Sequence, residues 1–129
     1  MEEEGLVVCD SDVLIEFLDR KNKAVEDRLV QIGMNQLCIS SITFSEVVVG
    51  SVDKIHRNKL IKGLSLFILI EIDSAIDEIH RSLVSRYSLS HRLGIQDAIV
   101  AASALKENYS LYTLNKKDFK FIQGLKLLK

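Results

Sequence analysis

The sequence contains no proline and only six glycines among its 129 residues. It also lacks Gly/Ser-rich stretches, low-complexity tracts and internal repeats. Flexible linkers between domains are commonly built from such segments. Their absence predicts a single domain spanning residues 1–129, which is long enough to bury a core without covalent staples.

Cysteine is scarce, with only Cys9 and Cys38 present. Both lie inside apolar runs, and their spacing matches no zinc motif. We therefore expect two buried free thiols that take no part in metal binding.

Long hydrophobic runs and an excess of one charge are absent as well. No apolar run approaches the roughly 18 residues that a membrane-spanning helix needs. The chain starts with the acidic "MEEEG", whereas a secretory signal starts with basic residues, so we expect a cytoplasmic protein. The net charge is −1, and any nucleic acid would have to bind a local basic patch.

Short apolar runs alternate with longer amphipathic segments along the chain. The short runs predict strands at residues 6–9, 37–40, 66–72, 110–113 and 125–128. Helical periodicity of apolar residues appears within 13–18, 25–32, 76–84 and 95–105. Because the strand segments are continuously apolar, both sheet faces should be covered. The alternation predicts an α/β fold, a three-layer α/β/α sandwich with a central, mainly parallel sheet.

Acidic residues fall where predicted strands end and helices begin. Asp10 and Asp12 follow the first strand in "LVVCDSDVLIEFL", Glu46 follows the second, and Asp97 lies at the start of "QDAIVAASAL". Each has a purely structural explanation. Asp10 or Asp12 could cap a helix, Thr43 and Glu46 have capping-box spacing, and Asp97 could favour a helix dipole.

Taken together, these carboxylates indicate a cation site. Sites form at the strand ends of a parallel sheet, and two carboxylates ~4 Å apart repel by about 4 kcal/mol at an effective dielectric near 20. Ligands that are all oxygen favour Mg²⁺ or Mn²⁺ over zinc. A cation held in this way commonly activates water and stabilises phosphoryl oxygens, so the pattern predicts hydrolysis of a phosphodiester or phosphomonoester.

A further polar cluster follows the fourth predicted strand in "LYTLNKKDFKFIQGLKLL". It contains Asn115 and Asp118. Both residue types also suit turns, so a turn and an extension of the cation site are both open.

Four segments in this order resemble the PIN-domain ribonucleases, and most closely the VapC-type toxins of toxin–antitoxin pairs. The segments are "VVCDSDVLIEFL", "ISSITFSEVVVG", "GIQDAIVAASAL" and "LYTLNKKDFKFIQGLKLL". The resemblance implies an α/β/α sandwich that hydrolyses RNA with Mg²⁺ or Mn²⁺. It also implies a homodimer and a small VapB-like antitoxin partner.

The resemblance implies a set of metal ligands and catalytic residues. Asp10, Glu46 and Asp97 would coordinate the metal. Asn115 stands where some members have a fourth acid, and it would orient the site. Asp118 would then complete the metal shell or position the attacking water.

Supporting residues also match the family pattern. Ser11 is the small hydroxyl residue after the first aspartate, and Asp12 stands where asparagine is common. Thr113 and Phe119 match the fourth motif.

Contacts to RNA would come from basic and aromatic side chains. Lys116 and Lys117 flank Asn115 and are the preferred phosphate contacts. Other basic residues are scattered as on an ordinary surface: Lys54, Arg57, Lys59, Lys62, Arg81, Arg86, Arg92 and Lys120. The aromatic candidates for base stacking are Tyr87, Tyr112 and Phe119, although the last two also suit the core. The three histidines (His56, His80 and His91) show no spacing typical of a metal or acid–base site, and no role is predicted for them.

Three alternatives share parts of this pattern. "VVCDSDVL" also resembles the first motif of haloacid-dehalogenase-type phosphatases, in which the first aspartate is a nucleophile. However, "GIQDA" offers one acid where that family has two. A phosphoacceptor receiver domain would use Asp73, at the end of the third strand, but the first aspartates are spaced differently. A catalytically weak PIN fold that only binds a partner is the third alternative, because Asn115 replaces an acid.

Overall fold

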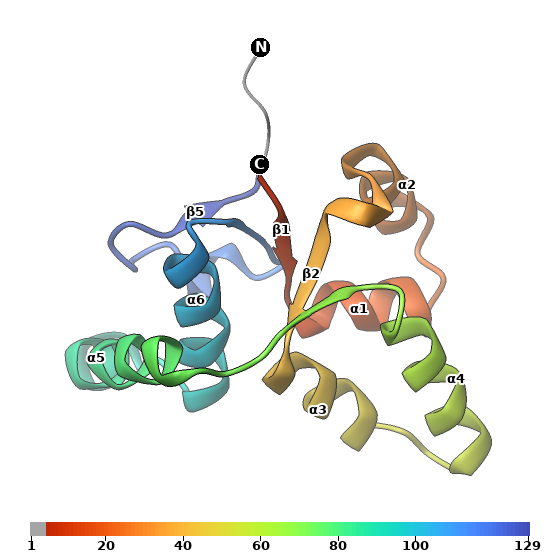
Figure 1. Cartoon of the computed structure of the whole chain (residues 1–129), viewed down its shortest axis with the longest axis horizontal. Coiled ribbons are helices and arrows are strands. Elements are labelled where there is room, and N and C mark those ends of the chain that lie inside the picture. Colours follow the sequence, from red (N-terminus) through yellow and green to blue (C-terminus); the bar gives the residue numbers. More distant parts are fainter. Residues whose placement is uncertain (1–4) are drawn as a thin grey trace.

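A five-stranded sheet in which every neighbouring pair is parallel forms the centre of the computed structural model (Figure 1). The structure describes residues 5–129. Residues 1–4, which carry the acidic start used above, lie outside the described residues. The strand order is β3-β2-β1-β4-β5. The strands are β1 (Val7–Cys9), β2 (Leu37–Ser40), β3 (Ile68–Ile70), β4 (Ser110–Tyr112) and β5 (Lys126–Leu127).

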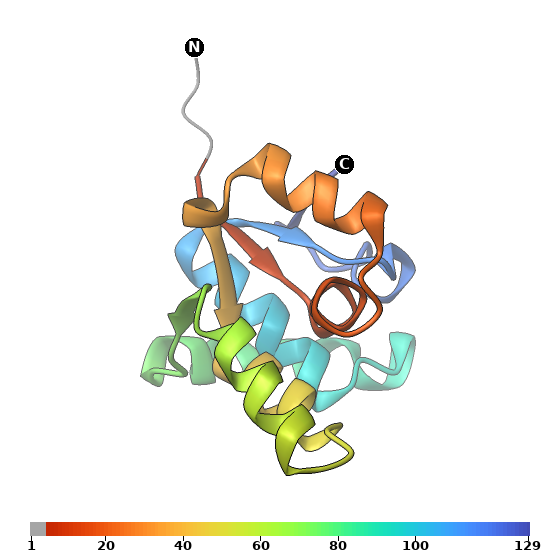
Figure 2. The ribbon, with the colours of Figure 1, turned by 90° about the vertical axis from the view of Figure 1, so that its right-hand side faces the viewer.

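Helices cover both faces of this sheet (Figures 1 and 2). One layer contains α1 (Ser11–Leu18), α2 (Lys23–Ile32) and α4 (Lys54–Leu64), and the other contains α5 (Ser74–His91) and α6 (Ile95–Glu107). The helix α3 (Ser41–Val49) packs against both α1 and α6. Two short 3₁₀ turns complete the elements, η1 (Met34–Gln36) and η2 (Lys116–Asp118). The predicted α/β/α sandwich is confirmed.

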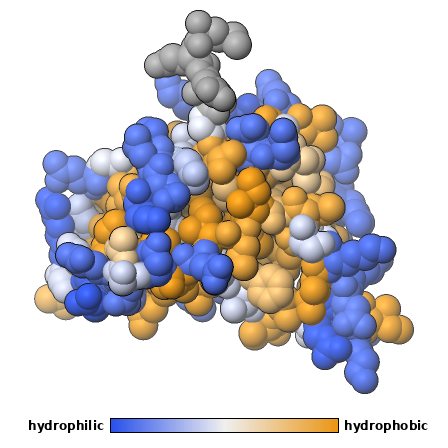
Figure 3. Space-filling model, in the orientation of Figure 1, coloured by the Kyte–Doolittle hydropathy of each residue, from blue (hydrophilic) through white to orange (hydrophobic). Residues whose placement is uncertain are grey.

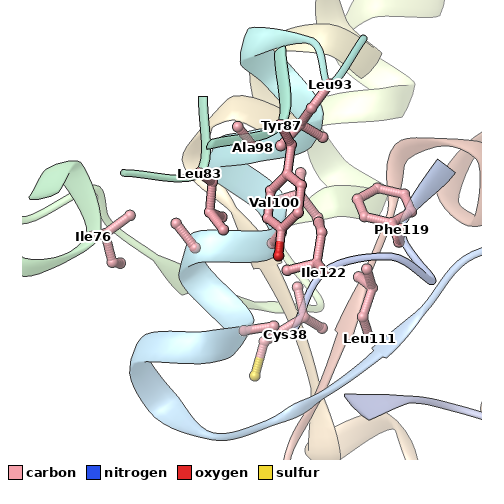
Figure 4. Close-up of a cluster of buried hydrophobic side chains, with 14 residues drawn as sticks. Cys38, Ile76, Leu83, Tyr87, Leu93, Ala98, Val100, Leu111, Phe119 and Ile122 are labelled. Atoms are coloured by element: carbon pink, nitrogen blue, oxygen red, sulfur yellow. The ribbon is translucent and has the colours of Figure 1, made fainter. Parts of the chain in front are cut away.

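Two apolar clusters hold the layers to the sheet. Successive residues of a strand point to opposite faces. Val7 and Cys9 therefore pack under α1, α2 and α4, while Val8 packs under α5 and α6. Figure 4 shows the second cluster, in which Tyr87 and Phe119 lie close to Leu111 of β4. Both cysteines are free and buried, as expected.

The sequence prediction fails at the sheet edge and in two helices. Residues 66–72 were expected to form a buried strand, yet the strand covers only Ile68–Ile70. It is also not buried, since Ile68 and Leu69 are 44% and 50% exposed. The reason is that β3 is an edge strand. Ile95, expected on the apolar face of α6, is 65% exposed, because small residues such as Ala98 and Ala101 form the buried face instead. The helix α4 had no predicted counterpart.

Between residues 5 and 129, no helix is both long enough and apolar enough to cross a membrane.

Candidate active site

The candidate site lies where the strand order reverses. The central strand β1 pairs with β2 on one side and with β4 on the other. In open parallel sheets, a crevice forms at the carboxyl ends of strands at such a switch point. Asp10 directly follows β1 and Thr113 directly follows β4, and the Asp10 N–H donates to the Tyr112 carbonyl at 3.0 Å. The sheet topology therefore brings the first and fourth motifs together.

Asp10 is held firmly by hydrogen bonds on both carboxylate oxygens. Oδ1 accepts from the Ser11 N–H at 2.9 Å, which makes Asp10 the N-cap of α1, and Oδ2 accepts from Thr113 Oγ1 at 2.9 Å. The residue is only 6% exposed. Burial, followed by the charge of Asp12, raises the pKa of Asp10 from 3.8 to about 7 although both hydrogen bonds lower it. The capping role and a place in the site thus coexist.

Asp12 lies in the first turn of α1 and reaches across to the segment after β4. Its Oδ2 accepts from the Leu114 N–H at 3.1 Å and from Asn115 Nδ2 at 3.3 Å, and it lies 3.5 Å from Thr113 Oγ1. Its Oδ1 is buried and has no hydrogen-bond partner in the described part of the chain. Burial raises the pKa of Asp12. One oxygen is therefore fixed by the segment after β4, and the other is buried without a hydrogen-bond partner among the described residues.

Glu46 lies well inside α3 and caps nothing. The N-cap of α3 is Ser40, whose hydroxyl accepts from the Ile42 N–H at 3.3 Å. The capping box expected from Thr43 and Glu46 is wrong, because the helix begins at Ser41 and Thr43 is buried within it. Burial, and then the charge of Asp97, raises the pKa of Glu46.

Asp97 lies in the first turn of α6, which begins at Ile95 with Gly94 as an N-cap that has no side chain to offer. Burial, and then the charges of Asp118 and Asp12, raise its pKa. Across residues 5–129, no hydrogen bond and no ion pair reaches the Asp97 carboxylate. A favourable helix dipole is thus the only structural stabilisation that the fold gives this charge.

These carboxylates form one electrostatic cluster. The charges of Asp118 and Asp12 raise the pKa of Asp97. The charge of Asp97 in turn raises the pKa of Asp10 and of Glu46. In the described chain, no Lys, Arg or His forms an ion pair with any of the five. Nor do any three Asp, Glu, His or Cys side chains of residues 5–129 converge closely enough to hold a metal ion on their own. The cluster is therefore negative, uncompensated and open.

The fourth motif contributes both a turn and a contact to the site. Asn115 precedes η2, its Nδ2 donates to Asp12, and its N–H donates to Thr113 Oγ1 at 3.1 Å. Asp118 is exposed on η2 and adds its charge beside Asp97. The turn is confirmed, and the position of the segment beside Asp12 and Asp97 is compatible with the extension of the cation site, which stays a prediction.

The basic and aromatic candidates divide by exposure. Lys116 and Lys117 are both exposed, as RNA contacts require, and Lys117 lines a hollow together with Asp97 and Asp118. Phe119 is 1% exposed, which confirms the core position that its apolar neighbours favour. Tyr87 is 7% exposed, so the expectation that it stacks on bases is wrong, and it too belongs to the core. Tyr112 is half-buried.

From the sequence, no role is predicted for His91, and Arg92 counts among the ordinary surface residues. The structure places both beside Asp97, in a hollow between the end of α5 and η2. Both lie within six residues of Asp97 in the sequence, but only the tertiary structure brings Lys117, Asp118 and Phe121 to the same hollow.

The sequence profile of the PIN domain matches residues 7–124. The chain belongs to the PIN-domain family. The match to the PIN domain argues against the phosphatase and receiver-domain alternatives. The strand order β3-β2-β1-β4-β5 also differs from the β2-β1-β3-β4-β5 order of receiver folds.

Several relatives of this PIN-domain chain are known. Ribonuclease VapC1 of Rickettsia felis is 38% identical over 104 residues, which cover 72% of this chain and 75% of that protein. A toxin–antitoxin complex from Klebsiella pneumoniae contains a chain with a TM-score of 0.77 and 29% identity, covering 92% of this chain and 94% of its own. VapBC2 from Rickettsia felis, bound to a DNA fragment from its promoter, gives a TM-score of 0.81 and 25% identity, with 95% and 97% covered.

Proposed function

We propose that this PIN-domain protein is a metal-dependent endoribonuclease and the toxin of a VapBC-type toxin–antitoxin pair. The observation that carries this proposal is the uncompensated carboxylate cluster at the switch point of a PIN fold. Relatives named as VapC ribonucleases support the reaction, and neighbours named as toxin–antitoxin complexes support the biological role.

The residues present fit a hard divalent cation, Mg²⁺ or Mn²⁺. Asp12 Oδ1 has no hydrogen-bond partner among the described residues. The neighbouring carboxylates raise the pKa values of Asp10, Glu46 and Asp97, as expected where a cluster lacks positive charge. Asp10, Glu46, Asp97 and Asp118 would hold the ion together with water and substrate phosphate, since no three of these side chains converge closely enough to hold it alone. Because Mg²⁺ usually keeps several waters and binds one or two carboxylates together with substrate phosphate, an open cluster suits it. When bound, the ion would lower the pKa of a water and offset charge on phosphate oxygens.

The chain's own groups keep these carboxylates in place. Thr113 Oγ1 and the Ser11 N–H orient Asp10, while Asn115 and the Leu114 N–H orient Asp12. Fixed groups of this kind cost no reorganisation during the reaction, which is how preorganised sites favour a transition state. Ser11, Thr113 and Asn115 thus act as positioning residues in this proposal.

A small VapB-like antitoxin is the proposed partner, and pairing with a second copy is also proposed, both in the cytoplasm. Figure 3 shows apolar residues gathered across the middle of one face, between hydrophilic flanks. The exposed residues Ile68, Leu69 and Ile72, at the β3 edge of the sheet, line a hollow. Large apolar patches on soluble proteins commonly mark interaction sites. Light scattering should give a mass of twice 14.6 kDa for the pure chain; a mass of 14.6 kDa at all concentrations would contradict the pairing.

The proposal is tested by incubating the protein with a pool of single-stranded and hairpin RNAs. We expect cleavage with Mg²⁺ or Mn²⁺ and none in excess EDTA. Asp10→Asn, purified in the same way, should not cleave, whereas Asp27→Asn, which removes an exposed carboxylate on α2, should cleave normally. Undiminished cleavage in EDTA would exclude the metal mechanism, and binding without cleavage under any metal would identify a binding-only PIN fold.

A further inference from the structure

A second feature adjoins the carboxylate cluster. A hollow of about 350 Å³ opens between the end of α5, the start of α6 and the segment around η2, and Asp97 and Asp118 form part of its wall. Its volume lies in the range typical of small-molecule sites. The rest of the wall includes His91, Arg92 and Phe121. The hollow is therefore continuous with the proposed metal site, and it carries groups of a different kind.

An aromatic stack forms one side of the hollow. The His91 and Phe121 rings are parallel, with centroids 4.1 Å apart and an interplanar angle of 11°. Phe121 in turn packs edge-on against Tyr87, with centroids 5.1 Å apart. Tyr87 is buried, and its hydroxyl accepts from the Gln123 N–H at 3.3 Å, so the stack is anchored in the core.

His91 is the exposed end of this stack. Phe121 stacks on one face of its ring, the Tyr87 ring meets it in a T-shaped arrangement with centroids 5.7 Å apart, and the residue is exposed. Ser90 Oγ lies 2.8 Å from His91 Nδ1 and helps to fix the ring. An exposed aromatic ring that is held in place is the kind of surface on which bases of single-stranded nucleic acid stack.

Two cations complete the hollow. Arg92 and Lys117 are exposed, and neither guanidinium nor ammonium forms an ion pair within residues 5–129. Arg92 ends α5 with φ 54°, a left-handed conformation that is unfavourable for a non-glycine residue. A short polar residue such as Asn would adopt this backbone more readily. The chain therefore places an arginine here against its backbone preference.

We propose that this hollow is a nucleotide subsite for single-stranded RNA, with a base stacked on His91 and a backbone phosphate held by Arg92 and Lys117. The subsite rests on the proposed ribonuclease function and extends it. The nucleotide bound here would be a neighbour of the scissile phosphate, since Asp97 and Asp118 belong to both features. The two cations would offset the charge of a phosphate close to a carboxylate cluster that otherwise repels it.

The test measures binding with cleavage blocked. The background is full-length Asp10→Asn protein with Mg²⁺, and the probes are a fluorescein-labelled random RNA hexamer and a ribose-phosphate hexamer without bases. Fluorescence anisotropy should show that His91→Ala weakens RNA binding about 5- to 100-fold. His91→Phe, which keeps a ring, should restore it. Neither change should alter binding of the baseless hexamer.

The phosphate contact has a separate readout. Arg92→Asn keeps a residue that tolerates φ 54° while it removes the charge. It should lower the slope of log Kd against log salt by about 0.7, the value for one phosphate on a single strand. Arg57→Asn on α4, which does not line the hollow, should leave the slope unchanged.

Each remaining result overturns the subsite. Equal RNA binding by His91→Ala and the background protein excludes stacking, and equal weakening for both hexamers assigns His91 a purely structural role. An unchanged salt slope in Arg92→Asn excludes the phosphate contact. These failures differ from failure of the proposed function, which is shown by absence of metal-dependent cleavage in the unmodified protein. Absence of any RNA binding would overturn both.

Discussion

Single carboxylates in this protein serve two purposes at once. Asp10 caps α1 and also turns its second oxygen toward Thr113, so the same side chain starts a helix and faces the site. Burial removes water from the Asp10 carboxylate and raises its pKa to about 7. Folding is therefore less favourable when this carboxylate is charged. The residues that define the site thus destabilise the metal-free protein, and this has measurable consequences.

The first prediction concerns pH. The folded protein binds the Asp10 proton more tightly than the unfolded chain does, so the free energy of unfolding should fall as pH rises from about 4 to 7 and level off above. The contribution of Asp10 is at most about 4 kcal/mol. Thermal unfolding in EDTA at pH 5 and pH 7.5 measures it, and Asp10→Asn should flatten the difference. Mg²⁺ should stabilise the unmodified protein at pH 7.5 more than at pH 5. Equal pH dependence in both proteins would contradict the raised pKa.

The second prediction separates a site role for Asp97 from a helix-dipole role. If like charges dominate, Asp97→Asn in EDTA should stabilise the protein by about 1 kcal/mol, or roughly 2–5 °C in Tm, at low salt. If only the dipole matters, the change should cost roughly 0.3–1 kcal/mol. Glu78→Gln on the exposed surface of α5 serves as the control. A lower Tm together with retained RNA cleavage would remove Asp97 from the site.

At the scale of elements, the helices bring distant motifs to one edge. The side-chain caps of α1 to α5 are Asp10, Asn22, Ser40, Asp53 and Asp73. The helix α6 has no side-chain cap, and its other end turns into β4 through Asn108 in a left-handed conformation with φ 59°. Asn108 and Tyr109 connect the helix that carries Asp97 to the strand that leads to Thr113.

The third prediction tests that connection. Asn108→Ala should lower the free energy of unfolding by about 1–2 kcal/mol, because alanine is poorly suited to the left-handed region. Asn108→Gly should be close to neutral, since glycine adopts it freely. Urea unfolding measures both. RNA cleavage by the folded variants should be unchanged, because Asn108 lies at the opposite end of β4 from the carboxylates. Equal stability of the two variants would show that the backbone conformation at this position costs nothing.

At the scale of the whole molecule, the proposed toxin should act on a cell through the same carboxylates. Inducing the unmodified protein alone in a bacterial host should arrest growth, because cleavage of cellular RNA stops translation. Asp10→Ala, produced at the same level, should permit growth. Colony counts after induction measure both. Equal arrest by the two proteins would show that the toxicity does not arise from this site. A single domain over residues 1–129 stays a prediction, since residues 1–4 lie outside the described residues.

The sequence by itself determined the layered α/β architecture and the positions of the acidic motifs. Apolar runs such as Val7–Cys9 and the helical spacing of apolar residues can be recognised within short stretches of sequence. Continuously apolar strands are enough to predict a sheet that is covered on both faces. Capping and a proposed site role could not be separated from sequence, because Asp10 caps α1 and also accepts a hydrogen bond from Thr113.

Only the tertiary structure decided which residues meet. Thr113 reaches Asp10 across 103 positions because β1 and β4 are neighbours in the sheet. The exposure of β3 follows from its place at the edge. The hollow with His91 depends on how α5 packs against α6 and η2. Strand order and helix packing arise from contacts between distant segments, and no short window of sequence contains them.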